Sequence, residues 1–422
     1  MTPKCGGDST PDRDAPFEPR RVLLDSAFKA DSPSQFTQLR AQGPVHPVVF
    51  SSGLEGWLVV RHQQAREALT HPSLLKDPRP AAAALEAAGY VAHRADVGGG
   101  HMLDSDPPVH TRLRRLVAGA FTSRRMVQLQ PRIEEIAYSL LDALPPSGEV
   151  DLVAGYTAPI PVTVIAELLG IPEEYRHSFR NWASDALAVG TPRSEPAFAN
   201  LRQLLAELIG VKSSSPQDDL MSALIAVRDQ DNGKLSHEEL VSTMLNLLIA
   251  GHETTVNLLG NAILALLQHP HQLERLRAEP NLIATAVEEF LRYDSSVEIS
   301  TLRFAAEDLE IGDTLITKGS IVAVALSSAS RDMSVDGYGN PHRLDVTRPT
   351  ARHLAFGHGI HHCLGAPLAR IEATVALSAL LARLQHLELA IPTDEIEWIP
   401  NGIMRGPLSI PVRYYSEPPR VR

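Results

Sequence analysis

The stretch that decides the fold is Phe356-Gly357-His358-Gly359-Ile360-His361-His362-Cys363-Leu364-Gly365, a glycine-rich approach to a single cysteine. Glycines permit backbone angles that a side chain would forbid, and they let the main chain lie close against a flat partner. Apolar residues recur at helical spacing after Cys363, with Pro367 in the first turn of the predicted helix. The dipole and the unpaired N–H groups at that helix start favour an anionic sulfur. The pattern therefore indicates a thiolate ligand for a metal.

Cys363 and Cys5 are the two cysteines of the chain, so no Cys-x-x-Cys pair and no disulfide framework can form. Two other interpretations stay open. Cys363 is an ordinary buried thiol in the first, and in the second it binds zinc together with His358, His361 and His362. The zinc site is disfavoured because neighbouring residues rarely converge on one small ion. The flanking glycines favour the thiolate ligand over the inert thiol.

The composition is that of a globular chain of 422 residues with 44% hydrophobic residues, which is enough for a substantial core. No uninterrupted apolar stretch of about 20 residues occurs, and Asp8, Asp12 and Arg13 lie where a signal peptide would need an apolar run. We therefore expect a cytoplasmic protein without membrane insertion. The net charge of -11 argues against general nucleic-acid binding.

One large domain is predicted over residues 17–415, preceded by a disordered leader at 1–16 and followed by a short tail at 416–422. The Pro- and Gly-rich breaks inside it are interpreted as loops of one fold. Alternating segments at 56–60 and 320–324 predict strands, while most of the chain has helical spacing. The predicted fold class is mainly α with small β-sheets.

A long helix is predicted from Ser236 to about Gln268. Ser236 and Glu239 form a capping box at its start, and His269-Pro270 ends the pattern. The segment Met244 to Ala250 is apolar on every face, so the middle of the helix should be buried.

A polar turn interrupts this buried helix at Gly251-His252-Glu253-Thr254-Thr255. Gly251 leaves room beside the helix, and a threonine hydroxyl can engage a backbone carbonyl and loosen the hydrogen-bond ladder. A bend solvated by trapped water would explain the same residues. Such a break of the local pattern usually marks function.

The run from Phe356 to Arg370, Phe-Gly-x-Gly-x-His-x-Cys-Leu-Gly-x-x-Leu-Ala-Arg, resembles the haem-binding signature of the cytochrome P450 family. The resemblance implies a triangular helical prism with haem b between the long central helix and the cysteine loop, and Cys363 as axial ligand of the haem iron. It also implies cofactor contacts from Phe356, Gly357 and Gly365. Ala250 to Thr255 resembles the family's oxygen-binding groove, which implies that Ala250 and Gly251 contact the cofactor and that Glu253 and Thr254 are catalytic.

Further residues match the family's supporting positions. By that resemblance two pairs, His110 with Arg114 and Arg303 with His361, bind the haem propionates. Glu289 and Arg292, three residues apart on one helix face, resemble the family's Glu-x-x-Arg pair. Arg343 fits the arginine that completes it. These three are assigned to folding and to the integrity of the pocket.

The resemblance implies a haem-thiolate monooxygenase that inserts one oxygen atom from O2 into a C–H or C=C bond. Electrons would come from ferredoxin and an NAD(P)H-dependent ferredoxin reductase, and a monomer is expected. The pattern is closest to actinobacterial members that tailor macrolides and other polyketides, so a bulky apolar secondary metabolite is the expected substrate. A steroid or terpenoid hydroxylase is the alternative of the same chemistry. The predicted pocket residues are Val97, Asn246, Val297, Ile299 and Ile403, with polar contacts expected from His93, Arg94 and Glu298.

Two other functions are weighed against this one. Peroxide-driven oxidation or oxidative ring coupling would use the same cofactor, but Glu253-Thr254 favours dioxygen activation. A non-catalytic haem-binding sensor would not need the acid–threonine turn, and it would usually carry an output domain.

Overall fold

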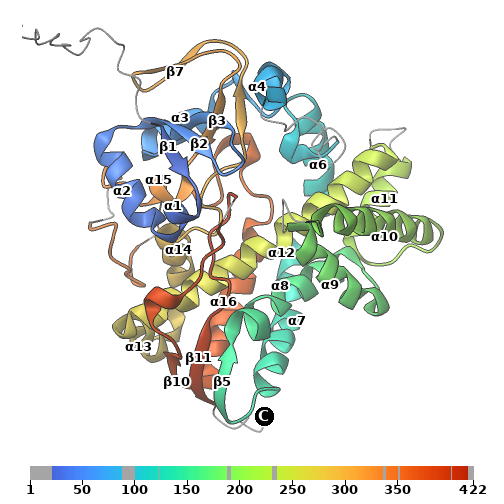
Figure 1. Ribbon diagram of the computed structural model, residues 1–422. Coiled ribbons are helices and arrows are strands. Elements are labelled where there is room, and N and C mark those ends of the chain that lie inside the picture. The colour runs from blue at the N-terminus through green and yellow to red at the C-terminus, as the bar shows by residue number, and fades with distance from the viewer. Residues whose placement is uncertain are drawn as a thin grey trace, which may run out of the picture.

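The computed structural model describes residues 21–87, 100–121, 123–187, 192–230, 235–335, 339–349, 352–400 and 402–416. Helices dominate these residues and three small sheets accompany them, which confirms the predicted class (Figure 1). The helices are α1 Ser26–Ala30, α2 Ser32–Gln42, α3 His62–Thr70, α4 Ala82–Ala87, α6 Val109–Ala120, α7 Ser123–Asp142, α8 Pro159–Leu169, α9 Glu173–Leu187, α10 Ser194–Ser214, α11 Leu220–Gln230, α12 His237–Gln268, α13 Pro270–Ala278, α14 Ile283–Tyr293, α15 Leu326–Ser330 and α16 Ala366–Arg383.

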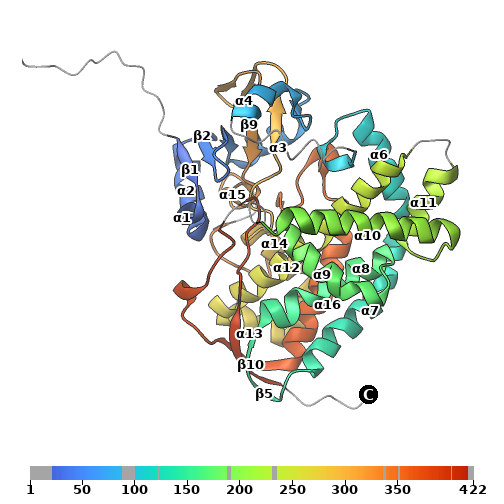
Figure 2. The same cartoon turned by 45° about the vertical axis from the view of Figure 1, so that its right-hand side comes forward.

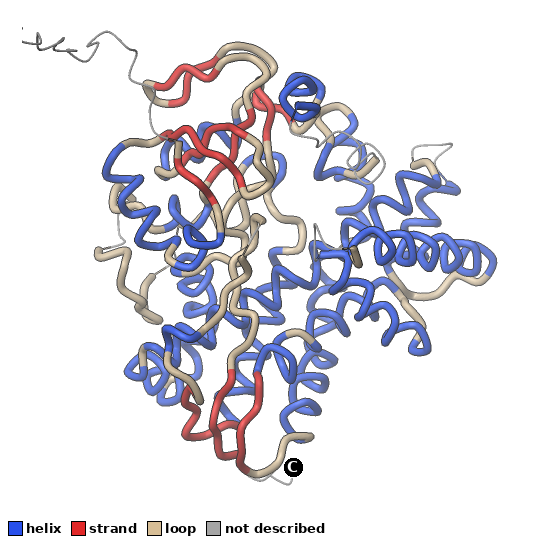
Figure 3. The backbone as a smooth tube through the Cα atoms, viewed as in Figure 1, coloured by secondary structure: helices blue, strands red, loops and turns tan. Residues whose placement is uncertain are grey.

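The strands gather at two places on opposite sides of the helical body (Figure 3). A six-stranded sheet has the order β1-β2-β3-β9-β6-β4, β7 and β8 form a two-stranded ribbon, and the third sheet has the order β10-β11-β5. The predicted strands at 56–60 and 320–324 are β3 and β9, which pair in parallel with Trp57 opposite Val322. The strands are β1 Val22–Leu24, β2 Val45–Phe50, β3 Glu55–Val59, β4 Leu74–Leu75, β5 Ser147–Asp151, β6 Arg303–Ala305, β7 Leu309–Ile311, β8 Thr314–Ile316, β9 Ile321–Val324, β10 Leu384–Leu389 and β11 Pro411–Ser416.

Helix α12 runs diagonally through the molecule and packs against α8, α10, α14 and α16 (Figure 1). Its start has the predicted capping box: Ser236 Oγ accepts from the Glu239 backbone N–H at 3.0 Å, and Glu239 Oε2 accepts from the Ser236 N–H at 2.8 Å. In the turned view α10 crosses in front of α8 and α9 (Figure 2). The long central helix and both of its predicted ends are confirmed.

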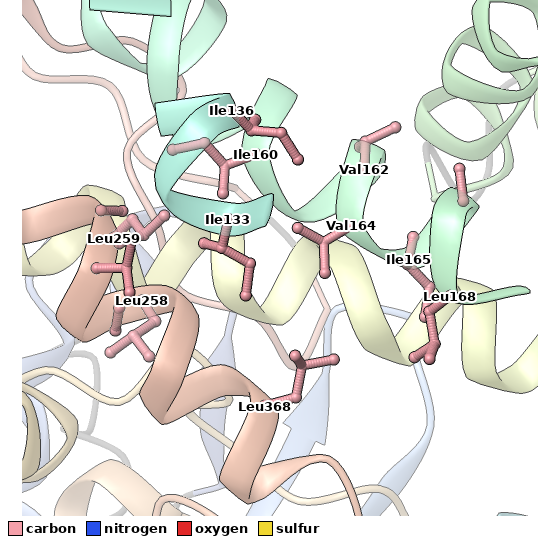
Figure 4. Close-up of a cluster of buried hydrophobic side chains, with 14 of the residues drawn as sticks. Ile133, Ile136, Ile160, Val162, Val164, Ile165, Leu168, Leu258, Leu259 and Leu368 are labelled. Atoms are coloured by element: carbon pink, nitrogen blue, oxygen red, sulfur yellow. The ribbon is translucent and has the colours of Figure 1, made fainter. Parts of the chain in front are cut away.

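The largest core lies where α7, α8, α12 and α16 meet. Branched apolar side chains from these helices point into one cluster (Figure 4). Ile133 and Ile160 have no measurable exposure, and Leu368 is 4% exposed. This packing fixes α16, and with it the loop before α16, against α12. Along the described residues, no helix is long and apolar enough to cross a membrane.

Candidate active site

The glycine-rich loop folds back on itself just before α16. The Cys363 backbone N–H donates to the Phe356 carbonyl at 2.9 Å, which closes the loop. Gly357 and Gly359 have φ of 71° and 76°, the left-handed region that glycine enters without strain. A Cβ at Gly359 would also lie 2.9 Å from Thr70 Cγ2, so the loop packs tightly on α3. Gly365 is the N-cap of α16 and Pro367 lies in its first turn, as predicted.

The Cys363 sulfur lies at the start of this helix. Its side chain is accessible to solvent, yet the protein around it is dense enough that desolvation is the largest effect and raises the thiol pKa. Backbone N–H groups of Gly365 and Ala366, together with the charges of Arg114 and Arg370, oppose that shift. Burial prevails, so the thiolate needs a cation bound to it to persist at neutral pH.

The ring of Phe356, at the start of the same loop, packs against the guanidinium of Arg370. The Arg370 guanidinium carbon lies 4.6 Å from the centre of the Phe356 ring. Arg370 also donates to both carboxylate oxygens of Glu288, at 2.5 and 3.0 Å, and His353 Nε2 lies 3.2 Å from Glu288. Burial alone would raise the pKa of Glu288, but the hydrogen bonds from His353 and Arg370 lower it to about 2. Sequence reasoning missed Glu288 and His353, since only their contacts mark them.

The acid–threonine turn lies in an unbroken part of α12. Thr254 Oγ1 donates to the Ala250 carbonyl at 2.7 Å, so the expected contact of a hydroxyl with the backbone is present, while the expected loosening of the helix is not, because α12 runs through this turn without a break. Burial raises the pKa of Glu253 to about 7. Ala250 is exposed although the helix around it is largely buried, and Asn246, Ala250 and Thr254 follow at intervals of four on one helix face.

Gly251 was predicted to contact the cofactor, and in the structure it lies against Ile165 of α8. A Cβ at this position would lie 2.9 Å from Ile165 Cδ1 on α8. The room beside the helix is therefore filled by a side chain of α8, and the glycine allows the two helices to pack closely. A contact of Gly251 with a cofactor stays a prediction.

His110, Arg303 and His361 form a buried cluster of nitrogen donors. The His110 and His361 ring centroids are 4.4 Å apart. Among the described residues, neither ring nitrogen of His110, nor Arg303 Nε, nor His361 Nε2 has a hydrogen-bond partner. Burial and then the charge of Arg114 lower the pKa of His110, against a smaller opposing effect of Asp106.

The charges around this cluster are mostly positive. Burial, then Lys76, His110, Arg303 and Arg114 together lower the pKa of His361 to about 3. Burial also lowers the pKa of Arg303 to about 10, against a smaller opposing effect of Asp106. Unpaired buried donors beside fixed positive charge are costly unless an anion accepts from them. Arg114 reaches the cysteine loop itself, since its Nη2 donates to the His362 carbonyl at 2.6 Å.

The predicted ion-pair triad exists, but with a different third member. Arg292 donates to Glu289 Oε2 at 2.7 Å and to Oε1 at 2.9 Å, and both side chains are fully buried. Arg348 Nε completes the group at 3.1 Å from Glu289 Oε2. Arg343 was the wrong arginine, because it contributes its carbonyl oxygen, which accepts from Arg292 and from Arg348. Arg348 lies five residues further along the chain, and the loop directs its guanidinium to Glu289.

Asn246 is partly buried on α12, and the other residues predicted for the substrate pocket divide into three groups. Val297 and Ile403 are half-buried and lie on segments joined by backbone hydrogen bonds, among them Glu298 N–H to the Ile403 carbonyl at 2.9 Å. Ile299 was wrongly placed, because its side chain is 3% exposed and packs in a core cluster of the six-stranded sheet. Glu298 is no polar contact for a substrate either, since it is completely buried against Lys29 and Ser32. Val97, His93 and Arg94 lie outside the described residues.

Comparison with known proteins decides the family. The family model described as Cytochrome P450 matches residues 197–413. The chain belongs to the cytochrome P450 family. It is 44% identical over 395 residues to "Cytochrome P450 monooxygenase PikC" of Streptomyces venezuelae, which covers 93% of each protein.

Other P450 relatives carry names that state a substrate. The "Vitamin D(3) 25-hydroxylase" of Pseudonocardia autotrophica is 44% identical, covering 92% of this chain and 95% of that protein. The "6-deoxyerythronolide B hydroxylase" of Saccharopolyspora erythraea is 42% identical, covering 93% and 98%. Among solved structures, that of the tirandamycin C-bound P450 monooxygenase TamI has a TM-score of 0.84 and 42% identity, and covers 93% of this chain and 99% of that one. The chain is thus a P450 monooxygenase with the fold of that family.

The family implies a haem, and the residues of this P450 fit one. A haem presents an iron that binds a thiolate and two propionates that accept hydrogen bonds. Cys363 supplies a sulfur with a raised pKa that a cation would lower, and the orphaned nitrogens of His110, Arg303 and His361 supply unsatisfied donors. The iron therefore has a candidate sulfur ligand in the protein, and the propionates have candidate hydrogen-bond donors that lack a partner in the protein.

Proposed function

We propose that this P450 inserts one oxygen atom from O2 into a C–H or C=C bond of a bulky apolar secondary metabolite. Haem b, ferredoxin, an NAD(P)H-dependent ferredoxin reductase and a cytoplasmic location belong to the proposal. The observation that carries it is the turn Ala250–Thr254 on α12, where a partly buried acid and a hydroxyl follow each other on the helix that packs against α16, the helix that begins just after the cysteine loop. A haem-binding sensor has no need of such a turn.

Glu253 and Thr254 are the catalytic residues in this proposal. Because its pKa is raised to about 7, Glu253 can both release and take up a proton near neutral pH. The Thr254 hydroxyl donates its one hydrogen bond to the Ala250 carbonyl, which leaves its oxygen lone pairs able to accept a hydrogen bond from a neighbouring donor. Rotation about χ1 would redirect that proton away from the helix. The pair can thus pass protons along α12 from the acid to the reacting oxygen.

Cys363 would hold the iron through its thiolate, and Phe356, Gly357, Ala250, Gly251 and Gly365 are the proposed cofactor contacts. Haem held by a cysteine thiolate supplies the oxidising chemistry, since electron donation from sulfur favours O–O cleavage. The protein's part is to hold the cofactor with His110, Arg114, Arg303 and His361, to position the substrate and to deliver protons. Glu289, Arg292 and Arg348 keep the fold around it.

A macrolide or polyketide is the proposed substrate class. The name of the 42% identical relative states a macrolactone, 6-deoxyerythronolide B. The proposed wall of the pocket is apolar apart from Asn246, and includes the half-buried Val297 and Ile403 on two paired segments. A second candidate is a steroid-like molecule, favoured by the 44% identity to a vitamin D3 hydroxylase.

The optical spectrum of the reduced protein with carbon monoxide tests the cofactor assignment. We expect a strongly red-shifted Soret band that Cys363→Ser abolishes, because serine cannot supply a thiolate. Cys5→Ser is the matched control and should leave the band unchanged. A histidine-type spectrum in the unaltered protein would refute the haem-thiolate proposal.

Thr254 variants test the proton path. Thr254→Ala should keep the red-shifted band and continue to consume NAD(P)H, while product formation falls by about tenfold or more and peroxide is released. Thr254→Ser keeps the hydroxyl and should retain most of the product. Full coupled turnover in Thr254→Ala would remove Thr254 from the mechanism.

A substrate panel tests the chemical class. Macrolactones, glycosylated macrolides, steroids and small aromatics are titrated against the ferric protein, and the shift of the haem spectrum is recorded. We expect shifts with macrolactones or macrolides, or with steroids if the second candidate is correct. Shifts with small aromatics alone would overturn both.

A further inference from the structure

Lys76 is a buried lysine directly after β4, and sequence reasoning did not single it out. The residue is 4% exposed. Its ammonium donates to the Thr301 carbonyl at 3.2 Å, to the Leu302 carbonyl at 3.0 Å and to the Thr301 hydroxyl. These acceptors lie immediately before Arg303, the first residue of β6. Lys76 therefore holds the segment that carries one of the proposed propionate ligands.

The same junction includes the helix of His110. Asp106 accepts from the backbone N–H groups of Lys76, at 3.0 Å, and Asp77, at 2.8 Å. The Asp106 carbonyl accepts from the His110 N–H at 2.9 Å, so the start of α6 is tied to Lys76 through a single residue. Arg303 Nη1 donates to the Leu74 carbonyl at 3.1 Å, which ties the third segment to β4.

Three segments thus bring three buried nitrogen-bearing side chains together. Lys76, His110 and Arg303 are 4%, 2% and 4% exposed. Lys76 and Arg303 carry two positive charges at this junction, and Asp106 carries one negative charge that also orients backbone N–H groups. The unpartnered nitrogens at this junction belong to His110 and Arg303, and buried donors without a partner favour a bound anion.

We propose that Lys76 is a further positioning residue of the cofactor pocket, whose ammonium holds Thr301 and Leu302 in place and adds positive charge on the side where His110 and Arg303 bind the haem carboxylates. The inference rests on the proposed haem-thiolate function. Two consequences follow from charge alone. The haem dissociates more slowly because Lys76 favours its carboxylates, and the ferric iron is reduced more easily because a nearby positive charge favours the added electron.

The test uses the holoprotein with Lys76→Met, Lys76→Gln and Lys76→Arg. Lys318→Met is the matched control, because Lys318 is an exposed lysine in the turn before β9. The reduction potential is measured by spectroelectrochemistry, and haem loss is measured by transfer to apomyoglobin. We expect a more negative potential and about tenfold faster haem loss for Met and Gln, since the loss of one buried positive charge near the haem carboxylates is worth roughly that factor. Arginine should restore most of both values, and the carbon monoxide spectrum should stay red-shifted throughout.

Several results would overturn the inference. Values for Lys76→Gln equal to those of Lys318→Met would show that the charge has no effect. Equal losses in Lys76→Arg and Lys76→Met would show that packing, not charge, is at work. If Lys76→Met does not retain haem at all, the Gln and Arg variants still decide, since both keep polar contacts to the carbonyls. Failure of the haem-thiolate function would show itself separately, as a missing red shift in the unaltered protein.

Discussion

Two buried charged clusters of this protein differ in one respect: one is complete within the chain and the other is not. Around Glu289, both carboxylate oxygens accept from guanidinium groups and the Asp345 N–H, and Arg292 finds further acceptors in the Pro341 and Arg343 carbonyls. Around His110, four buried nitrogens of the described residues have no partner. The complete cluster serves the fold, and the incomplete one points to a ligand.

Breaking the complete cluster should have the largest effect on stability. Arg292→Met would leave the Glu289 carboxylate buried at the centre of the group without its main partner. We expect the free energy of unfolding to fall by about 3–5 kcal/mol, the usual cost of an unpaired buried charge. Denaturant titration measures this loss of stability. In cells, we expect the variant to be produced in low yield and to contain little haem.

The double variant Glu289→Gln with Arg292→Met is the control for that prediction. Because it removes the carboxylate that Arg292→Met would leave without its main partner, it should recover part of the lost stability, and the part not recovered includes the loss of the Arg348 contact to Glu289. Strictly additive losses would argue that packing, and not the ion pair, holds this region together.

Glu372 is a buried acid outside both clusters, and its effect on stability should depend on pH. It is 1% exposed on α16, and its Oε2 has no partner among the described residues. Burial raises its pKa from 4.5 to about 8, so the folded protein keeps a proton that the unfolded chain releases above pH 4.5. Stability should therefore fall as the pH rises from 4.5 to about 8 and then level off for this group.

Glu372→Gln should remove that part of the pH dependence. The unaltered protein should lose a few kcal/mol relative to the variant across the window, since each pKa unit corresponds to about 1.4 kcal/mol. Unfolding at a series of pH values measures the difference. Parallel curves for the two proteins would mean that Glu372 is paired and not isolated.

Arg343 and Arg348 sharpen the description of the complete cluster. Arg348→Met removes a guanidinium that donates to Glu289 and should cost about 1.5–3 kcal/mol, the value of hydrogen bonds to charged groups. Arg343→Met leaves the carbonyl that the cluster uses and should cost within about 0.5 kcal/mol. The reverse order of effects would restore Arg343 as the third member.

The sequence predicted what depends on local pattern. The capping box at Ser236, the end of α12, the span of α14 and the turn into α16 all follow from residues within one or two helical turns of each other. The hydroxyl-to-carbonyl bond of Thr254 is of the same kind. These features need only backbone geometry and side-chain chemistry, both of which are readable along the chain.

What escaped prediction depends on contacts between distant segments. Arg348 was missed because the loop that returns it to Glu289 has no local signature, and Ile299 was misplaced because one step along an extended segment turns a side chain to another side. The sequence predicted Glu298 as a polar pocket residue, because its ion pair with Lys29, 269 residues away in the chain, has no local signature. Whether a buried polar group is paired is thus the property that sequence conveys least.

The same substitution in the incomplete cluster should have the smallest effect on stability and yet a clear one on the cofactor. Arg303 is 4% exposed with an orphaned Nε, so its charge is poorly compensated by the protein. Arg303→Met should change the stability of the haem-free protein by no more than about 0.5 kcal/mol, because the loss of its hydrogen bond to the Leu74 carbonyl is offset by the removal of a poorly compensated buried charge. Haem should dissociate about tenfold faster from the same variant, because a charge-assisted donor is lost. Arg292→Met should destabilise the protein with or without haem. A large loss of stability in Arg292→Met and a small one in Arg303→Met would show that Arg292 serves the fold and that Arg303 serves the bound cofactor. Equal destabilisation of the haem-free protein by both substitutions would show that Arg303, too, serves the fold.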